Sequence, residues 1–242
     1  MSSLTWRGTV GVVKPTYDSG TLVEFVRLLP EGIGVIPVYL GLKEHTAKEY
    51  LAALDSYHGK IAELVEKGVD LIHPEGAPPF LIRGYKREQE LVKSWQDEFK
   101  IPIATSGMTQ IAAFRALGIK RLLGVTFHDQ TINDMFAGYF VEAGFDLVAI
   151  EGMPVERSRR QTLSAEEIYR HIKKMFLKHS GIDGIYLQGS GTWRATDVIS
   201  LEEDLEIPVV HPVAARVWYI QKRLRIRQPV KGAGRLLEEM PN

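Results

Sequence analysis

Two loops of this 242-residue chain carry residue types that could do chemistry. Residues 189–192, Gly-Ser-Gly-Thr, follow a predicted strand and precede a predicted helix. Backbone N–H groups in that position can hold a carboxylate, an enolate or a phosphate. The alternative is a tight turn that only leads into the helix. The segment lacks the Lys-Ser/Thr pair of a P-loop, and no Gly-x-Gly-x-x-Gly fingerprint of a dinucleotide site opens the chain.

The other loop, residues 74–79, reads Pro-Glu-Gly-Ala-Pro-Pro and also follows a predicted strand. Its Glu75 could act as a general base if a dry cleft raised the pKa of the carboxyl group. Otherwise Glu75 is a solvated loop carboxylate. Pro78 and Pro79 have no backbone N–H, so this loop is the poorer anion cradle of the two.

Further polar side chains stand at predicted strand ends. Lys14 and Tyr17 follow the first strand, where a lysine either pairs with a carboxylate or lies on the surface. His128 follows the strand at 121–125 and can titrate near neutral pH.

Two other histidines, His73 and His211, adjoin strands and are expected in the core or at its rim. No His-x-x-x-His or His-x-His spacing occurs, so we expect no metal site. A serine hydrolase is also not expected, because the residues around Ser190 do not form the Gly-x-Ser-x-Gly nucleophile elbow.

Composition narrows the class of protein. Thirty Lys and Arg balance thirty Asp and Glu, and the one basic cluster, residues 222–227, resembles a solvated helix end, which argues against nucleic-acid binding. No apolar run reaches the roughly 18 residues of a membrane span, and residues 1–7 lack a signal-peptide core, so we expect a cytoplasmic protein without a membrane partner. The absence of cysteine excludes disulfides, thiolate nucleophiles and Cys-ligated metal sites.

The elements that must position these residues alternate strictly between strand and helix. Strands are predicted at residues 9–13, 34–40, 69–73, 102–105, 121–125, 147–150, 184–187 and 209–210. Helices are predicted at residues 21–29, 47–67, 86–98, 107–117, 131–143, 164–179 and 214–224, with a further one ending at 205. Thr46 and Ser164 each begin a Thr/Ser-x-x-Glu capping box.

Such alternation predicts an α/β fold with parallel strands covered by helices. Eight strands fit either a (β/α)₈ barrel or two doubly wound lobes of four strands each. Residues 69–76 resemble residues 182–189, and each segment comes third in its half and ends in a Gly loop. This repeat favours two lobes related by a pseudo-twofold axis, with the two loops facing each other across a cleft.

Several stretches, in this order, carry a resemblance to a known group of enzymes. They are residues 11–15, 76–79, 83–84, 114–121, 126–133, 183–187 and 207–210. Over roughly residues 8–218 the chain resembles the aspartate/glutamate racemase superfamily, in the branch of maleate cis-trans isomerases and arylmalonate decarboxylases.

The resemblance implies two Rossmann-like lobes with four-stranded parallel sheets and an active site in the cleft between them. Residues 1–106 and 212–242 would form the first lobe, and residues 107–211 the second. It also implies a homodimer and cofactor-free chemistry, in which one cysteine in each strand-end loop moves protons or attacks a double bond.

This chain departs from that pattern at both cysteine positions. Gly76 stands at the first one, as in the decarboxylases. The second falls on Ser190, which brings Arg194 and Asp197 into register, or on Gly189 by strict counting. A serine hydroxyl is too weak an acid to replace a thiol that cycles through thiolate.

Other family groups also change. The family's loop tyrosine falls on His128, and the hydroxyls that hold the substrate carboxylate become Ala77 and Pro78. The candidates for proton transfer are therefore Glu75, His128 and Lys14, with Ser190 orienting or relaying.

We therefore expect a cofactor-free lyase (a decarboxylase) or isomerase that acts on a small carboxylic acid through an enolate-like intermediate. The residues expected to contact this substrate are Pro15, Thr16, Tyr17, Gly76, Ala77, Gly189, Gly191 and Thr192. Two rival interpretations remain: the scaffold serves a cysteine-free hydrolysis or hydration, or the protein binds a carboxylate without turning it over.

Overall fold

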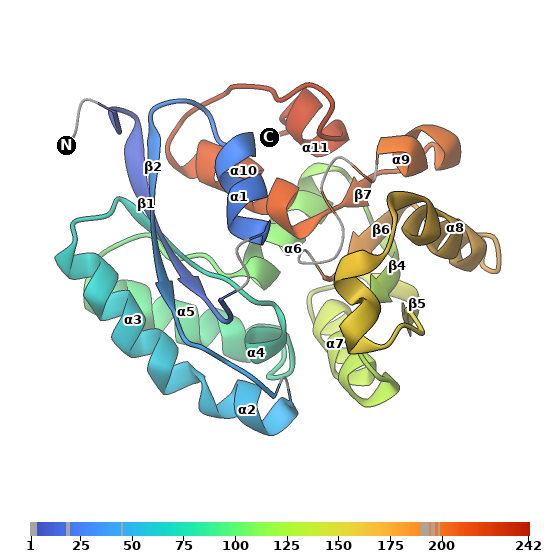
Figure 1. Ribbon diagram of the computed structural model, residues 1–242, viewed down its shortest axis with the longest axis horizontal. Coiled ribbons are helices and arrows are strands. Elements are labelled where there is room, and N and C mark those ends of the chain that lie inside the picture. Colours follow the sequence, from blue (N-terminus) through green and yellow to red (C-terminus); the bar gives the residue numbers. More distant parts are fainter. Residues whose placement is uncertain (1–3, 18–19, 45, 190–193, 195–196, 198) are drawn as a thin grey trace.

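Two parallel β-sheets form the frame of the molecule, with helices packed around them (Figure 1). The structure is a computed structural model that describes residues 4–17, 20–44, 46–189, 194, 197 and 199–242. The first sheet has the order β2-β1-β3, and the second has the order β5-β4-β6-β7. The strands are β1 (Gly8–Lys14), β2 (Ile33–Tyr39), β3 (Leu71–Pro74), β4 (Arg121–Thr126), β5 (Asp146–Gly152), β6 (Gly184–Leu187) and β7 (Val209–Val210). The prediction of two lobes is confirmed, and the barrel alternative is wrong.

The strand expected at residues 102–105 is reduced to one bridge. The Ile72 amide donates to the Pro102 carbonyl oxygen at 3.0 Å, and the Ala104 amide donates to the Ile72 carbonyl oxygen at 3.1 Å. Pro102 has no N–H, and Thr105 already begins the next helix, so only Ile103 pairs with Ile72. Four full strands are therefore found in the second sheet only.

The second lobe repeats this arrangement. The Ile185 amide donates to the Pro208 carbonyl oxygen at 3.0 Å, and the two-residue strand β7 leads directly into a helix. His211 caps that helix, because its Nδ1 accepts a hydrogen bond from the Val213 amide at 3.2 Å. The matching strand orders of the two sheets agree with the internal sequence repeat.

The helices follow the predicted alternation with four differences. Their bounds are α1 (Gly20–Leu28), α2 (Ala47–Ala52), α3 (Leu54–Glu66), α4 (Pro78–Leu81), α5 (Tyr85–Phe99), α6 (Ser106–Ala116), α7 (Gln130–Glu142), the 3₁₀ helix η1 (Arg157–Thr162), α8 (Ala165–Phe176), α9 (Ile199–Leu205), α10 (Pro212–Arg223) and α11 (Arg235–Glu239). The helix expected at 47–67 is divided at Ala53. Pro78, at the first helical position, begins the short α4 inside the expected loop. The elements η1 and α11 were not predicted.

The two capping boxes differ. At Ser164 both reciprocal hydrogen bonds with Glu167 form. At Thr46 the hydroxyl accepts from the Glu49 amide, but the Glu49 carboxylate accepts from the amides of Lys43 and Glu44 instead. Only half of the first box is therefore present.

Helix α10 lies at the centre of the molecule. It packs against α1 and α6, and the C-terminal helix α11 folds onto it (Figure 1). The Trp218 indole N–H donates to the Pro241 carbonyl oxygen at 3.0 Å, which fixes the end of the chain on this helix. The assignment of residues 212–242 to the first lobe stays a prediction.

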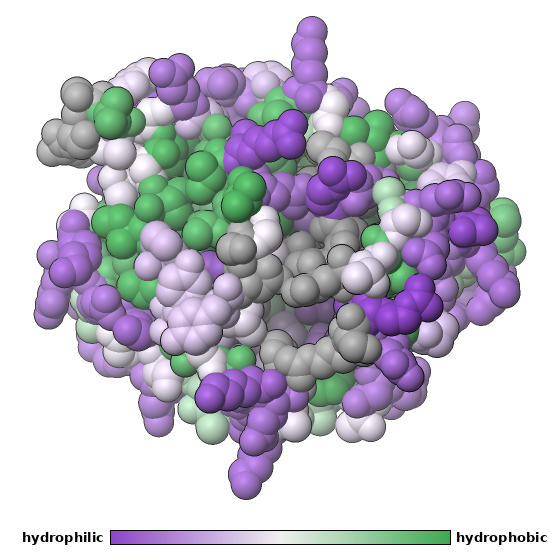
Figure 2. Space-filling model, viewed as in Figure 1, coloured by the Kyte–Doolittle hydropathy of each residue, from purple (hydrophilic) through white to green (hydrophobic). Residues whose placement is uncertain are grey.

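The surface is mainly polar. Figure 2 shows hydrophilic residues around most of one face, with apolar residues gathered over α1 and β2. Val23 and Val26 of α1 are among the exposed apolar residues. Among the helices of the described residues, none combines the length and the apolar character needed to traverse a bilayer.

Candidate active site

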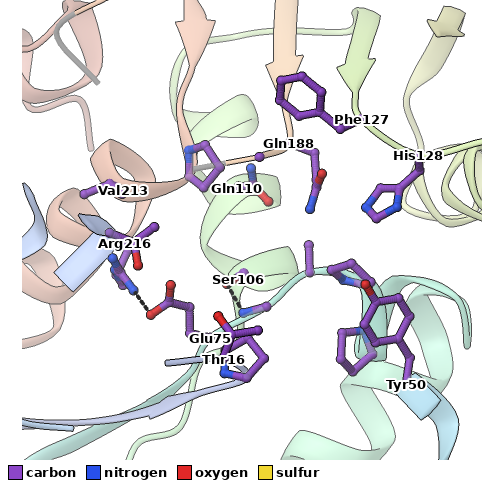
Figure 3. A pocket seen from close by; sticks show the side chains of 18 of the residues that line it. Thr16, Tyr50, Glu75, Ser106, Gln110, Phe127, His128, Gln188, Val213 and Arg216 are labelled. Atoms are coloured by element: carbon purple, nitrogen blue, oxygen red, sulfur yellow. Dashed lines mark hydrogen bonds and ion pairs between the residues drawn. The ribbon is translucent and has the colours of Figure 1, made fainter. Parts of the chain in front are cut away.

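A cavity of about 200 Å³ lies where the carboxyl ends of strands from both sheets meet (Figure 3). Its walls come from the segments after β1, β3, β4 and β6 and from α1, α2, α4, α6, η1 and α10. The lining residues are Pro15, Thr16, Thr21, Tyr50, His73, Glu75, Gly76, Ala77, Pro78, Pro79, Ser106, Gln110, Phe127, His128, Arg160, Gln188, Gly189, Pro212, Val213 and Arg216. Parallel α/β sheets bind ligands at this end of their strands.

A buried cluster of three charged side chains lies at the floor of the cavity, and two of them, Glu75 and Arg216, line it. Glu75 follows β3, and its carboxylate accepts hydrogen bonds from Arg216 Nη1 at 2.7 Å and from Lys14 Nζ at 3.2 Å. Lys14 Nζ also donates to Thr21 Oγ1 at 2.5 Å. The exposed fractions of the Lys14 and Arg216 side chains are 1% and 2%, so these charges interact in a dry environment.

This cluster holds Glu75 in its ionised form. Burial alone would raise the pKa of Glu75, but the adjacent Arg216 and Lys14 cations outweigh burial and lower it to about 2. The expectation of a raised pKa is therefore wrong, and so is the alternative of a solvated carboxylate. The physical reason is that the cleft dehydrates Glu75 and also supplies two cations.

His73 lies beside this cluster and is neutral. Burial, and then the Arg216 charge, lower the pKa of His73 to about 3. Its Nε2 lies 3.4 Å from Ser106 Oγ, and that oxygen accepts a hydrogen bond from the Gly76 amide at 3.2 Å. Ser106 thus links the imidazole to the strand-end loop that contains Gly76.

His128 lies on the second-lobe side of the cavity (Figure 3). Its amide donates to Thr126 Oγ1 at 3.1 Å, and its carbonyl oxygen accepts from Asn133 Nδ2 at 3.3 Å. A Cβ at Gly152 would lie 2.1 Å from that carbonyl oxygen. The last residue of β5 must therefore be glycine for the His128 loop to take this path.

Arg160 of η1 supplies a further cation to the same side. Its Nη2 donates to the Phe127 carbonyl oxygen at 2.6 Å, and the guanidinium lies 5.4 Å from the centre of the Phe127 ring. The cavity is therefore lined by two guanidinium groups among the described residues, those of Arg160 and Arg216.

The structure brings together most of the residues expected from the sequence. Those that line the cavity are Glu75, His128, Pro15, Thr16, Gly76, Ala77 and Gly189. Lys14 does not line the cavity itself, but its Nζ donates a hydrogen bond to Glu75, which does. Ser190, Gly191 and Thr192 lie outside the described residues.

Tyr17 is a correction to the expected set. It lies outside the cavity lining with 73% of its surface exposed. Its ring stacks on Tyr39 with 5.3 Å between centroids, because the chain turns outward after β1.

The sequence does not point to four residues that line the cavity: Arg216, Ser106, Gln110 and Arg160. The helix that carries Arg216 reads Pro-Val-Ala-Ala-Arg-Val-Trp, and an arginine within such an apolar stretch signals a buried, paired charge. Ser106 and Gln110 lie on α6, one turn apart, and no local motif marks them.

Comparison with known proteins gives the chain a family. The model of the arylmalonate decarboxylase family matches residues 10–237. Arylmalonate decarboxylase of Bordetella bronchiseptica is 23% identical over 215 residues, which cover 87% of this chain and 88% of the relative.

Solved structures show the same fold. The maleate isomerase Iso from Pseudomonas putida S16 matches with a TM-score of 0.87 at 19% identity, over 96% of this chain and 99% of that one. A crystal structure of arylmalonate decarboxylase matches with a TM-score of 0.82 at 20% identity, over 96% and 99% of the two chains. A maleate cis-trans isomerase of Nocardia farcinica matches with a TM-score of 0.87 at 16% identity, over 96% of this chain and 98% of that one. Since the family match spans nearly the whole chain and both repeated lobes, this protein belongs to the arylmalonate decarboxylase family.

Proposed function

We propose that this protein is a cofactor-free enzyme that acts on a small carboxylic acid through an enolate-like intermediate, as a decarboxylase or a cis-trans isomerase, without a cysteine nucleophile. The observation that carries this proposal is the cavity of about 200 Å³ between the strand ends of both lobes, with cations at its floor and an imidazole on its wall. The relatives, named as arylmalonate decarboxylase and maleate isomerase, support the reaction class.

The electrostatics of the cavity suit an enolate. When a carbanion forms next to a carboxylate, its negative charge moves onto the carboxylate oxygens. Fixed positive charges in a dry site stabilise that charge without reorganisation. Decarboxylation is the preferred outcome, because loss of CO₂ leaves one carbanion that needs one proton, and the chain contains no thiol to supply a second proton-transfer group.

We assign the protonation step to His128. The Glu75 carboxyl is ionised and paired, and an arginine does not give up its proton at neutral pH. His73 is neutral, and Lys14 Nζ is bound to Glu75 and Thr21. The remaining titratable lining side chains in the described part of the chain are His128 and Tyr50, and an imidazole has the ordinary pKa nearer to neutral pH. The His128 imidazolium would protonate the carbanion carbon and then recover a proton from solvent.

The test is ¹H NMR in D₂O with arylmalonates, alkylmalonates and maleate. The wild-type protein should release CO₂ from a malonate and place deuterium at the α-carbon, or convert maleate to its trans isomer. His128→Asn should slow the reaction by about 10² or more, since general acid catalysis contributes about that much. His58→Asn changes an exposed histidine that pairs with Glu98 and should leave the rate unchanged.

Each result is informative. Turnover of His128→Asn at the wild-type rate would remove His128 from the reaction. Unchanged spectra for every acid would refute enolate chemistry with this panel and favour hydrolysis, hydration or binding without turnover. The role of Ser190 stays a prediction.

A further inference from the structure

We propose that Arg216 binds a carboxylate of the substrate at the cavity floor, and that Glu75 sets the charge of this site by leaving one positive charge in surplus. This inference rests on the proposed function for its substrate class, but its test does not depend on turnover. It assigns carboxylate recognition to α10 rather than to the strand-end loop after β3.

The first observation is an unused donor on Arg216. The guanidinium has five N–H groups, and Nη1 donates to Glu75. Its Nε is buried and has no hydrogen-bond partner in the described part of the chain. A buried donor without a partner is costly, so a ligand oxygen that accepts from it gains binding free energy. Arg216 is one of the residues that line the cavity, so its guanidinium borders the space that a carboxylate would occupy (Figure 3).

The second observation is the charge count of the cluster. Lys14 and Arg216 are both cationic, and each forms its ion pair with the same carboxylate, Glu75. Within the described ranges no second Asp or Glu lies within ion-pair distance of either cation. The neighbouring imidazole of His73 is neutral and adds no charge. Two cations and one anion leave a surplus of one positive charge in a dry site, and one carboxylate would balance it.

The third observation concerns the loop after β3. Ala77 has no side-chain donor, and Pro78 and Pro79 have no N–H at all. The Gly76 amide already donates to Ser106 Oγ. This loop therefore offers little to an anion, whereas the floor directly beneath it offers a guanidinium.

The orientation of Arg216 is fixed before any ligand arrives. Its guanidinium carbon lies 4.0 Å from the centre of the Phe25 ring, which covers one face of the group. Glu75 holds one edge through Nη1. A site that is already oriented loses little side-chain entropy on binding.

The test uses isothermal titration calorimetry with malonate and succinate, and with succinamide as the neutral counterpart of succinate. Three proteins differ in the charge of the floor: Glu75→Gln raises the surplus, the wild type keeps it, and Arg216→Gln removes it. We expect affinity for the dianions to fall in that order, by at least about tenfold at each step. Arg216→Lys keeps the charge but loses the planar fork, so its affinity should lie between those of the wild type and Arg216→Gln.

Controls separate this order from general effects. Lys222→Gln removes one positive charge from the exposed end of the same helix and should leave affinity unchanged. Succinamide should bind all variants alike. Circular dichroism of each variant establishes that it is folded before titration.

Two results would overturn the inference: no saturable binding of malonate or succinate to the wild-type protein, or equal affinities in the three charge states. If Glu75→Gln binds less tightly than the wild type, the cluster is a structural unit rather than an anion site. Tight, Arg216-dependent binding without any turnover would uphold the inference while the proposed function fails.

Discussion

Arg216 Nη1 and the Glu75 carboxylate lie 2.7 Å apart although 141 positions separate the two residues in the sequence. This contact joins α10 to the loop after β3, and Lys14 adds the end of β1 to the same point. Because both cations depend on one carboxylate, the three side chains should contribute unequally to stability.

Glu75→Gln should be the most destabilising single change in the cluster. It leaves Lys14 and Arg216 buried beside each other without a counter-charge, which should cost about 3 to 5 kcal/mol of the free energy of unfolding. Arg216→Gln leaves the Lys14–Glu75 pair balanced and should cost only about 1 to 3 kcal/mol. Urea denaturation of both variants measures the difference.

The double variant Glu75→Gln/Arg216→Gln is the control for this comparison. It should be more stable than Glu75→Gln alone, since it removes one of the two unpaired cations. Equal costs for the two single changes, with simple additivity in the double variant, would contradict this account of the cluster.

Gly152→Ala should disturb the loop that carries His128. The new Cβ would lie 2.1 Å from the His128 carbonyl oxygen, so the loop must move, at a cost on the order of 1 to 3 kcal/mol. The rate of turnover should fall with it, because the imidazole moves relative to the cavity floor. Thermal unfolding and the NMR assay above measure the two effects.

Gly138→Ala is the matched control, because a Cβ on this exposed position of α7 meets no other atom within 4 Å. It should stabilise the protein by up to about 1 kcal/mol through helix propensity and leave turnover unchanged. If Gly152→Ala leaves both stability and turnover unchanged, the His128 loop can move to accommodate the new Cβ at no cost.

Glu88 should make the protein less stable as the pH rises. Burial raises the pKa of Glu88 from 4.5 to about 7, although its carboxyl accepts hydrogen bonds from Thr105 Oγ1 and the Tyr139 hydroxyl. The unfolded chain releases this proton above about pH 4.5 and the folded chain only near pH 7. The contribution of Glu88 to the free energy of unfolding is therefore complete below about pH 4.5 and is lost by about pH 7, a change of about 3 kcal/mol.

Urea titrations at several pH values, with Glu88→Gln beside the wild type, isolate this group. The variant should lose the decline in stability between about pH 4.5 and 7. An unchanged pH profile in the variant would show that Glu88 titrates normally.

His73 should have the opposite effect on the acid side. Since burial and Arg216 lower the pKa of His73 to about 3, the unfolded chain takes up a proton below about pH 6.5 that the folded chain refuses. Stability should fall as the pH drops from about 6.5 to 3, by about 4 kcal/mol. His73→Gln should remove the part of this fall in stability that lies above about pH 4.5, where the titration of Glu75 does not yet contribute. His58→Gln is the control, because it changes an exposed histidine and should leave the fall unchanged. A profile that His73→Gln leaves unaltered would contradict the buried, neutral imidazole.

Much of the fold could be predicted because strand and helix periodicity is local. The strands near residues 9–13, 121–125 and 184–187 lie almost where expected. The reduction of the fourth strand of the first sheet to one bridge could not be predicted. Ile103 is apolar like a strand residue, but Pro102 and Thr105 limit its pairing. The strand propensity of a residue does not show how many backbone hydrogen bonds it can form with the neighbouring strand.

The site was predictable where chemistry follows a strand, as at Glu75 and His128. The state of Glu75 was not, because its pKa depends on Arg216, which lies far away in sequence and in a helix whose apolar neighbours suggest core packing. Charged residues that only the tertiary structure brings together show no characteristic spacing in the sequence. His73 shows the same limit: the expected position in the core or at its rim is confirmed, but nothing in the sequence marks its place beside two cations.

The central position of α10 has a kinetic consequence. Lys14 stands near one end of the described chain and Arg216 near the other, so the cavity floor forms only when a very long loop closes. Loop-closure entropy must be overcome before the ion pairs can compensate for it, and such distant contacts slow folding. During refolding, helical structure should therefore recover before the cavity floor does. The ability to bind malonate would return last, in the same step that seats α10 between the lobes.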